Sequence, residues 1–208
     1  MTEHALKDQR HDQILEAAGK LFASKGFDKT SVDEIAKEAG LSKGAVYWYF
    51  PSKERILIAL ADQFEHQSQD VVVDLAQIDM LGPEALFLAH RHLYEQKANN
   101  PLPDLLFQQF VSMSAKFPEV AEALDRNQKS WVGVIKQLLD NAVENGYFKP
   151  FDTRLISESI SALYRGTCTT RYDSPDRAYE IVEYTCKLVY DAVVTDKRKA
   201  ELAKGAGA

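Results

Sequence analysis

The stretch Thr30–Lys53, TSVDEIAKEAGLSKGAVYWYFPSK, predicts two short helices joined by a tight turn. Ser31 is a residue type that caps helices, and Glu34, three residues later, completes a capping box. Gly40 ends this first helix, because glycine adopts the left-handed backbone conformation at no steric cost. Ser42 then caps a second helix. Two short helices around a glycine turn are the helix-turn-helix pattern.

The apolar residues of this stretch give each helix an inner and an outer side. The first helix has the i, i+3, i+4, i+7 stripe of a core-facing helix, at Val32, Ile35, Ala36 and Ala39. In the second helix, Val46 and Phe50 are four residues apart and are expected to face inward. The other side offers small, aromatic and cationic groups, at Lys43, Gly44, Tyr47 and Trp48. Such a surface suits a major groove lined by phosphates.

The alternative interpretation is an ordinary core helix with an aromatic stripe. Residues 47–50 are four consecutive aromatics, and consecutive residues on a helix point in different directions. They cannot all face one core, so some must be exposed or face a partner. For Tyr49, packing against the helix expected over about 7–25 remains an open interpretation.

The chain carries a negative net charge, so its compatibility with DNA binding depends on where the charged residues lie. The chain has 208 residues, with the hydrophobic and charged fractions of a soluble globular protein, and a net charge of −6. Nine of the 25 basic and nine of the 31 acidic residues lie in residues 1–55, which are therefore neutral. The acidic excess lies in residues 56–208, away from the proposed reading element. No apolar run reaches 18 residues and the start, MTEHALKDQR, is polar, so we expect a cytoplasmic protein with no membrane partner.

The periodicity of the whole chain predicts an all-α fold of about nine helices. A bracing helix over about 7–25 precedes the two short ones, and a fourth helix starts after Ser52 and runs on to about Leu75. Further helices are expected at about 83–98, 103–116, 118–145, 152–170 and 175–195, followed by a frayed tail. We expect two domains, a helix-turn-helix domain over 1–55 and a helical effector-binding and dimerisation domain over 56–208.

Residues 21–57, LFASKGFDKTSVDEIAKEAGLSKGAVYWYFPSKERIL, resemble the N-terminal domain of the tetracycline-repressor (TetR) family of bacterial and archaeal transcription regulators. The resemblance extends from about residue 10 to 57. It implies a homodimer that places two reading helices in the major grooves of a palindromic operator on double-stranded DNA. The two half-sites of such an operator lie about 34 Å, or a multiple of that distance, apart.

The family's DNA contacts carry over to nine positions of this chain. Positions where the family approaches bases or nearby phosphates are Ser42, Lys43, Gly44, Ala45 and Tyr47. Positions where the family contacts the DNA backbone are Ser31, Trp48, Tyr49 and Lys53. Family members often carry a hydroxyl or amide side chain where this chain has Ala45, and a histidine where it has Trp48. Alanine can touch a thymine methyl group but cannot hydrogen-bond, so these two positions leave the base preference open.

The remaining helices offer an effector site and a dimer interface as interpretations, each beside plain core packing. Candidates for binding an apolar or aromatic small-molecule effector are His90, Tyr94, Phe107, Phe110, Met113, Trp131, Tyr164 and Cys168. Candidates for the dimer interface are Ala162, Gly166, Tyr184, Leu188 and Val189. The helix at 175–195 is apolar on more than one side, and the helix at 152–170 offers small residues for a close approach of helices.

No motif for catalysis or for a metal or other cofactor is present. There is no phosphate-binding glycine loop, no zinc-type Cys/His spacing and no nucleophile elbow, so we expect no enzyme activity. Asp62 and His66 have i, i+4 spacing, but a metal site needs more ligands. Cys168 and Cys186 are interpreted as reduced structural thiols, with a redox switch as the alternative.

The sequence thus predicts a ligand-responsive, dimeric, sequence-specific DNA-binding regulator that acts as a repressor and leaves its operator when an effector binds. One alternative keeps the DNA-binding element, while the second domain only dimerises or binds a protein. The other is a small-molecule-binding protein or enzyme without a DNA role. It predicts that Lys43→Ala and Tyr47→Ala leave function unchanged.

Overall fold

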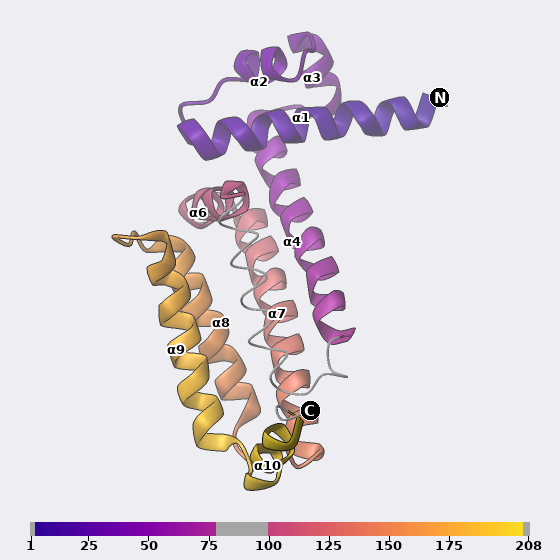
Figure 1. The fold of residues 1–208 in the computed structure, drawn as a ribbon. Coiled ribbons are helices and arrows are strands. Elements are labelled where there is room, and N and C mark those ends of the chain that lie inside the picture. The colour runs from indigo at the N-terminus through magenta and orange to yellow at the C-terminus, as the bar shows by residue number, and fades with distance from the viewer. Residues whose placement is uncertain (1–2, 78–99, 206–208) are drawn as a thin grey trace. The chain divides into compact units, whose positions relative to one another are not determined.

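The computed structural model describes residues 3–77 and 100–205, which form nine helices and no strand (Figure 1). In chain order these are α1 (Glu3–Lys25), α2 (Val32–Glu38), α3 (Lys43–Tyr49), α4 (Lys53–Gln77), α6 (Leu102–Ser114), α7 (Pro118–Glu144), α8 (Thr153–Thr169), α9 (Pro175–Val193) and α10 (Asp196–Gly205). The expected all-α fold is confirmed. The helix expected at 83–98 lies outside the described residues.

The chain divides into two compact units. The first comprises Met1–Gln67 and Asn100–Arg126, and the second comprises Ser68–Asn99 and Asn127–Ala208. The helices α4 and α7 each begin in the first unit and continue into the second. The first unit thus includes α6 beside the helix-turn-helix, whereas the functional boundary expected at residue 55 remains a prediction.

The core of the first unit is built by the stripe of α1 that faces α2 and α3. Figure 1 shows these two short helices beside α1. The fully buried residues of this α1 stripe include Ile14, Ala18 and Phe22, which are spaced three to four residues apart as in a core-facing helix. Gly26 ends α1 with a φ of 86°, and Phe27 folds back until its ring centroid lies 5.3 Å from that of Phe22.

The helix α6 also packs against α1, at a position where α1 has no side chain. A Cβ added to Gly19 of α1 would lie 3.5 Å from Cδ1 of Leu106 in α6 and 3.7 Å from Cδ2 of Leu60 in α4. These distances are ordinary van der Waals contacts, so Gly19 marks a close approach of three helices. On the inner side of α6, Phe110 is fully buried and its ring packs edge-on against Phe64 of α4 at 5.6 Å.

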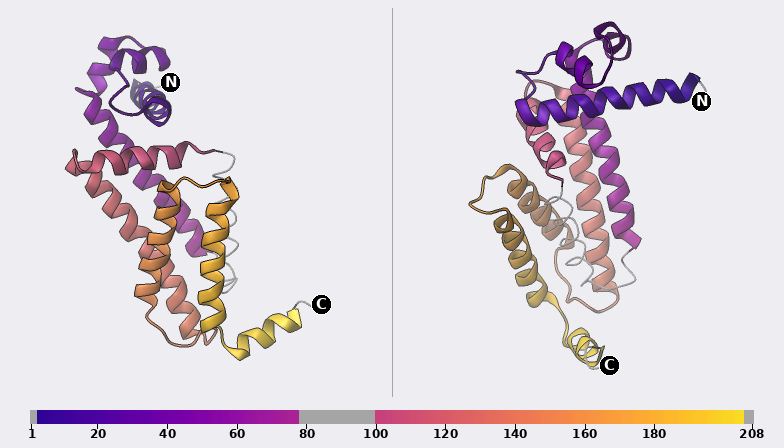
Figure 2. Two further views of the ribbon diagram at one scale, coloured as in Figure 1. Left: turned by 90° about the vertical axis from the view of Figure 1, so that its left-hand side faces the viewer. Right: turned by 45° about the horizontal axis from the view of Figure 1, so that its top comes forward.

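In the second unit, α8 and α9 run side by side and antiparallel (Figure 2). A small core at the end of α7 comprises Leu139, Ala142, Phe148 and Val194. Phe148 and Val194 form an antiparallel bridge, which joins the segment after α7 to the end of α9. Backbone hydrogen bonds continue it, from Lys149 N to the Val193 carbonyl and from Thr195 N to the Tyr147 carbonyl.

Residues 196–205 of the tail form the helix α10, so the expectation of a frayed tail was wrong for this described part. Thr195 accepts a hydrogen bond from the backbone N–H of Arg198, which satisfies one of the free donors in the first turn of α10. The Arg198 guanidinium lies 4.4 Å from the ring centroid of Tyr147 and pairs with Glu201. These tertiary contacts hold a charged segment that has little apolar surface of its own.

None of the helices described is both long enough and apolar enough to cross a lipid bilayer.

Candidate nucleic-acid interface

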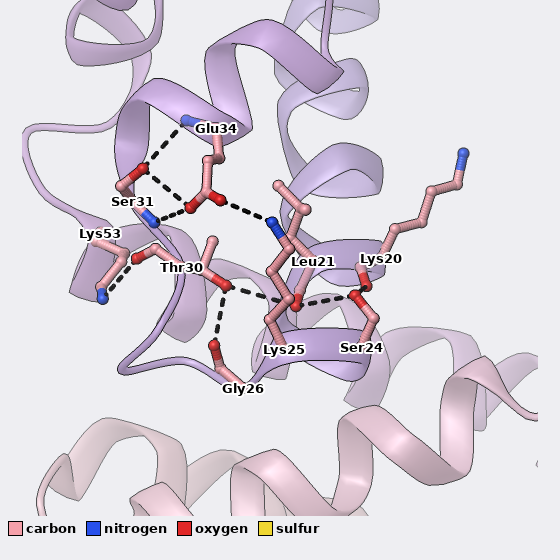
Figure 3. Close-up of polar contacts among 9 residues, drawn as sticks. All are labelled: Lys20, Leu21, Ser24, Lys25, Gly26, Thr30, Ser31, Glu34 and Lys53. Carbon is pink, nitrogen blue, oxygen red and sulfur yellow. Dashed lines mark hydrogen bonds and ion pairs between the residues drawn. The ribbon is translucent and has the colours of Figure 1, made fainter.

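The first helix of the helix-turn-helix begins at the capping box expected from the sequence (Figure 3). The Ser31 hydroxyl oxygen accepts a hydrogen bond from Glu34 N at 3.3 Å, and Ser31 N donates to Oε2 of Glu34 at 2.9 Å. Lys25 Nζ contacts Oε1 of the same carboxylate at 2.6 Å. The Lys25 hydrogen bond, followed by the two from Ser31, lowers the pKa of Glu34 from 4.5 to about 2.

The loop between α1 and α2 is held by two buried or half-buried side chains (Figure 3). The hydroxyl of Thr30, which is 2% exposed, donates to the Gly26 carbonyl at 2.9 Å. Lys53 Nζ donates to the carbonyls of Phe27 at 2.7 Å and of Thr30 at 2.8 Å. The same ammonium lies 4.3 Å from the ring centroid of Phe27. Lys53 therefore stabilises the loop that sets where α2 begins.

The second helix, α3, has a buried side and a broad exposed side. The Ser42 hydroxyl oxygen accepts from Ala45 N at 3.1 Å and so caps the helix. Val46 is fully buried and Phe50 is 5% exposed, as the sequence predicts. Their burial leaves Tyr47 45% and Trp48 67% exposed on the opposite side. Exposed aromatics of this size, in the last turn of a short helix, are suited to contact with a partner.

The cation at the start of α3 is paired in the free protein. Lys43 Nζ lies 2.8 Å from Oδ2 of Asp33 in α2, and both side chains are more than half exposed. The hydrogen bond and charge of Asp33 raise the pKa of Lys43, which keeps it cationic. An exposed pair of this kind is weak and screened by salt, so a phosphate can compete with Asp33 for the ammonium.

Seven of the nine predicted DNA contacts lie on or immediately before α3, at positions 42–49. Tyr49 is half-buried, with its ring 4.7 Å from that of Trp48 in an edge-on arrangement. The other two predicted contacts, Ser31 and Lys53, are engaged in the capping box and in the loop. Their contact with DNA stays a prediction, alongside the structural role just described.

The N-terminal turns of α1 also lie against α3, which the sequence reasoning missed. The ring of His11 packs 4.9 Å from that of Phe50, and Lys7 Nζ lies 5.3 Å from the ring centroid of Trp48. The spacing contained a signal for this contact. Lys7, His11 and Ile14 follow the i, i+4, i+7 rule, so these three residues lie on the same side of α1.

The residues predicted to bind an effector are divided between the two units. Phe107 and Phe110 are buried in the first unit, where Met113 is half-buried. The half-buried members of the second unit are Trp131, Tyr164 and Cys168. His90 and Tyr94 lie outside the described residues. Plain core packing accounts for Phe110 in α6, whose ring contacts Phe64.

One buried polar group in the second unit was not anticipated from the sequence. Asn127 of α7 is 8% exposed, and its Nδ2 has no hydrogen-bond partner among the described residues. A buried donor without a partner costs about 1–3 kcal/mol, so an unpaired amide in a folded protein calls for an explanation. The signal was available, because Asn127 continues the buried spacing of Val120 and Leu124.

The predicted dimer residues lie on the paired helices α8 and α9. Ala162 and Gly166 are exposed on α8, and Val189 is half-buried on α9. Tyr184 is 67% and Leu188 53% exposed on α9. Leu155 of α8, which the prediction omitted, is 59% exposed. Large apolar side chains on two adjacent helices form the kind of surface that a protein partner covers.

Cys168 and Cys186 are not joined in a disulfide, and burial raises the pKa of the Cys186 thiol. A raised pKa disfavours the reactive thiolate, in agreement with a structural thiol. Among the described residues, no group of three or more His, Cys, Asp or Glu side chains is arranged to hold a metal ion.

Comparison with known proteins agrees with this architecture. The family described as "Bacterial regulatory proteins, tetR family" matches residues 14–60. The HTH-type transcriptional regulator YuxN of Bacillus subtilis is 52% identical over 56 residues, which are 27% of this chain and only 19% of YuxN. The HTH-type transcriptional repressor KstR2 of Mycobacterium tuberculosis is 30% identical over 151 residues, covering 69% of this chain and 71% of the repressor.

A solved structure extends the similarity to nearly the whole fold. It is a TetR-family transcriptional regulator from Mesorhizobium loti, and it superimposes with a TM-score of 0.77 over 94% of this chain and 100% of its own. At 17% identity this likeness concerns the fold alone. The match to KstR2 extends well beyond the helix-turn-helix, and the family match runs from within α1 to within α4. This chain therefore belongs to the TetR family of DNA-binding transcriptional regulators and is not an enzyme.

Proposed function

We propose that the chain is a ligand-responsive repressor that reads a palindromic operator with the exposed side of α3. The observation that carries this proposal is the division of α3 into a buried anchor and an exposed surface. Val46 and Phe50 fix the helix in the domain, while Tyr47 and Trp48 remain exposed beside Lys43. A helix held rigidly by one side can insert the other into a major groove. KstR2, of which the similarity covers 71%, is by name a repressor.

Two copies of α3 are needed, because one short helix reads only a few base pairs. We propose that α8 and α9 supply the dimer interface, on which Tyr184, Leu188 and Leu155 are more than half exposed. Ala162 and Gly166 add small residues that let helices approach closely. A two-fold interface is self-complementary, so the same surface on each subunit is sufficient.

The effector in this proposal is a mainly apolar or aromatic small molecule bound by the second domain. Half-buried Trp131 and Tyr164 supply aromatic surface in the second unit. The Nδ2 of Asn127 is a buried donor with no acceptor among the residues that the structure describes. An effector that carries a carbonyl or carboxylate oxygen would satisfy this donor, and the gain would be larger than at an exposed site.

Coupling between the sites would pass along α4 and α7, since both helices begin in the first unit and continue into the second. A coupling free energy of about 1–3 kcal/mol is typical and changes affinity about 5–150-fold. In the dimer, a small displacement of α4 would alter the spacing of the two α3 helices against the grooves.

The DNA-binding part is tested by recovering the genomic DNA bound by the protein and measuring its affinity by fluorescence anisotropy. We expect a palindrome, and we expect Lys43→Ala and Tyr47→Ala to weaken binding while the fold and the dimer persist. Unchanged DNA binding in both variants would overturn the proposed role of α3.

The ligand-responsive part is tested separately, with a thermal-shift screen of apolar and aromatic compounds that carry an acceptor oxygen. A compound that binds the folded state raises the melting temperature by mass action. We expect the same compound to release the recovered DNA in the anisotropy assay. A compound that binds without changing DNA affinity, or a broad screen with no binding compound, would favour a domain that only dimerises or binds a protein.

A further inference from the structure

The start of α1 contacts the exposed edge of the recognition helix through a lysine and a tryptophan. Lys7 Nζ lies 5.3 Å from the ring centroid of Trp48, whose side chain is 67% exposed. One turn further along α1, the ring of His11 packs 4.9 Å from that of Phe50, which is buried at the end of α3. This second contact fixes the direction of α1 beside α3. The position of Lys7 relative to the recognition helix is therefore set by the fold.

Lys7 differs from several other lysines of the first unit in the partner of its ammonium group. Lys43 pairs with Asp33, Lys25 with Glu34, and Lys20 with Glu16. Lys53 instead donates to two backbone carbonyls. Among the described residues, no carboxylate pairs with Lys7, which is exposed and lies over an aromatic face. An aromatic face orients a cation without neutralising it.

We propose that Lys7 is an additional DNA-phosphate contact that lies beside α3 and is positioned by Trp48. The inference rests on the proposed function, because it assumes that the exposed side of α3 enters the major groove. With Trp48 at that surface, an ammonium 5.3 Å from its ring is within reach of the backbone that borders the groove. Trp48 is then a positioning residue for Lys7 in addition to its own predicted backbone contact.

The local charge balance gives this contact its importance. Residues 1–55 have no net charge, and the chain as a whole carries −6, so long-range attraction to DNA is weak. Affinity must then come from individual cations held at the surface. Each phosphate neutralised by a cation releases counterions and steepens the dependence of log K on log salt by about 0.9. Loss of one contact should therefore be visible in the salt slope, whatever the DNA sequence.

The experiment uses the full chain and a labelled duplex of arbitrary sequence, with affinity measured by anisotropy between about 50 and 200 mM salt. We expect Lys7→Gln to reduce the slope by about 0.9 for each subunit engaged. Across that fourfold rise in salt, the wild type then loses about 3.5-fold more affinity per contact than the variant. Lys7→Arg keeps the charge and the contact with an aromatic face, so it should retain the wild-type slope.

Lys20→Gln is the matched control, because it removes the same charge from the same helix. Lys20 is paired with Glu16 and lies 13 residues along α1 from Lys7, about 20 Å away. That separation exceeds the Debye length of about 8 Å at physiological salt, so this variant should keep the slope. In a Trp48→Leu background, Lys7→Gln should reduce the slope by less than in the wild type, because no aromatic ring then positions the Lys7 ammonium.

The two proposals fail in different ways. If the wild type binds no duplex DNA, the proposed function fails. If the wild type binds with a steep salt dependence and Lys7→Gln has the same slope, the phosphate contact is overturned and the proposed role of α3 stands. An equal reduction by Lys7→Gln and Lys20→Gln would also overturn it, because a general charge effect would then account for both. Lys7 is exposed, so these variants are expected to fold, and circular dichroism verifies it.

Discussion

The backbone N–H of Phe27 donates a hydrogen bond to Oε1 of Gln109 at 3.2 Å, across 82 positions of sequence. Phe27 follows Gly26, whose positive φ ends α1, and Gln109 lies in α6. The Phe27 ring also packs edge-on against Phe117, with centroids 5.5 Å apart. The loop that leads into the helix-turn-helix is therefore held by a polar contact with α6 and by an aromatic contact with the turn that follows α6.

Replacement of Gln109 by leucine should destabilise the first unit. Phe27 is 2% exposed, so its N–H would lose its acceptor in a place that water reaches poorly. The cost of a buried donor left unpaired is about 1–3 kcal/mol of unfolding free energy. Urea denaturation followed by circular dichroism measures this difference. Ser112→Ala, at an exposed position of the same helix, should have an effect near zero.

Replacement of Lys53 by methionine separates its structural role from its predicted role in DNA binding. Methionine keeps most of the apolar stem but cannot donate to the Phe27 and Thr30 carbonyls. We expect a loss of about 1–3 kcal/mol in unfolding free energy, since hydrogen bonds from charged groups are stronger than neutral ones. Unchanged stability with weakened DNA binding would assign Lys53 to phosphate contact alone.

The capping box predicts how stability depends on pH. The pKa of Glu34 is lowered from 4.5 to about 2, first by Lys25 and then by Ser31. A lowered folded-state pKa means that the stabilisation is complete above about pH 4.5 and is lost as the pH falls toward about 2. Glu34→Gln should therefore be less stable than the wild type at neutral pH, and the difference should shrink over this window.

Thermal unfolding at a series of pH values measures this difference. Glu38→Gln is the matched control, because Glu38 is exposed in the last turn of α2, away from the capping box. A gap between wild type and Glu34→Gln that stays constant from pH 7 to about pH 2 would contradict the assignment.

Introduction of a charge on α9 should prevent dimerisation. Leu188 is 53% exposed within one chain, and burial of a glutamate against a second copy would cost more than the leucine contact gains. We expect Leu188→Glu to be a folded monomer in analytical ultracentrifugation, with weakened binding to a palindromic duplex. Leu202→Glu on α10, at a position 38% exposed, should leave the assembly unchanged. If Leu188→Glu remained a dimer, the interface would have to lie on another surface.

Asn127 should show opposite effects on stability and on effector binding. Replacement by leucine removes a buried Nδ2 that has no partner among the described residues, so stability should stay equal or rise. Affinity for an effector with an acceptor oxygen should fall about 5- to 10-fold, as expected for one lost hydrogen bond of about 1 kcal/mol or slightly more. Calorimetric titration with a compound identified by thermal shift measures this affinity. A large loss of stability would instead indicate that the amide has a structural partner.

Local chemistry explains why so much of the DNA-binding element was predictable from sequence. The capping of α2 by Ser31 and Glu34, the left-handed turn at Gly40 and the cap at Ser42 each depend on residues within four positions of one another. The burial of Val46 and Phe50 follows from helical spacing alone. These features determined the two short helices, their inner sides and the exposed surface of α3.

Contacts between distant segments depended on the tertiary structure. Helical spacing cannot tell which carboxylate pairs with Lys43, that Lys53 bonds to the loop before α2, or that Gln109 accepts from Phe27. The helix α10 in the tail is supported by the packing of Arg198 against Tyr147, some 50 positions earlier. Lys7 reaches Trp48 only because His11 and Phe50 hold α1 beside α3. The sequence therefore determined the short helices of the DNA-binding element and their buried sides, and packing decided which partners the polar side chains reach.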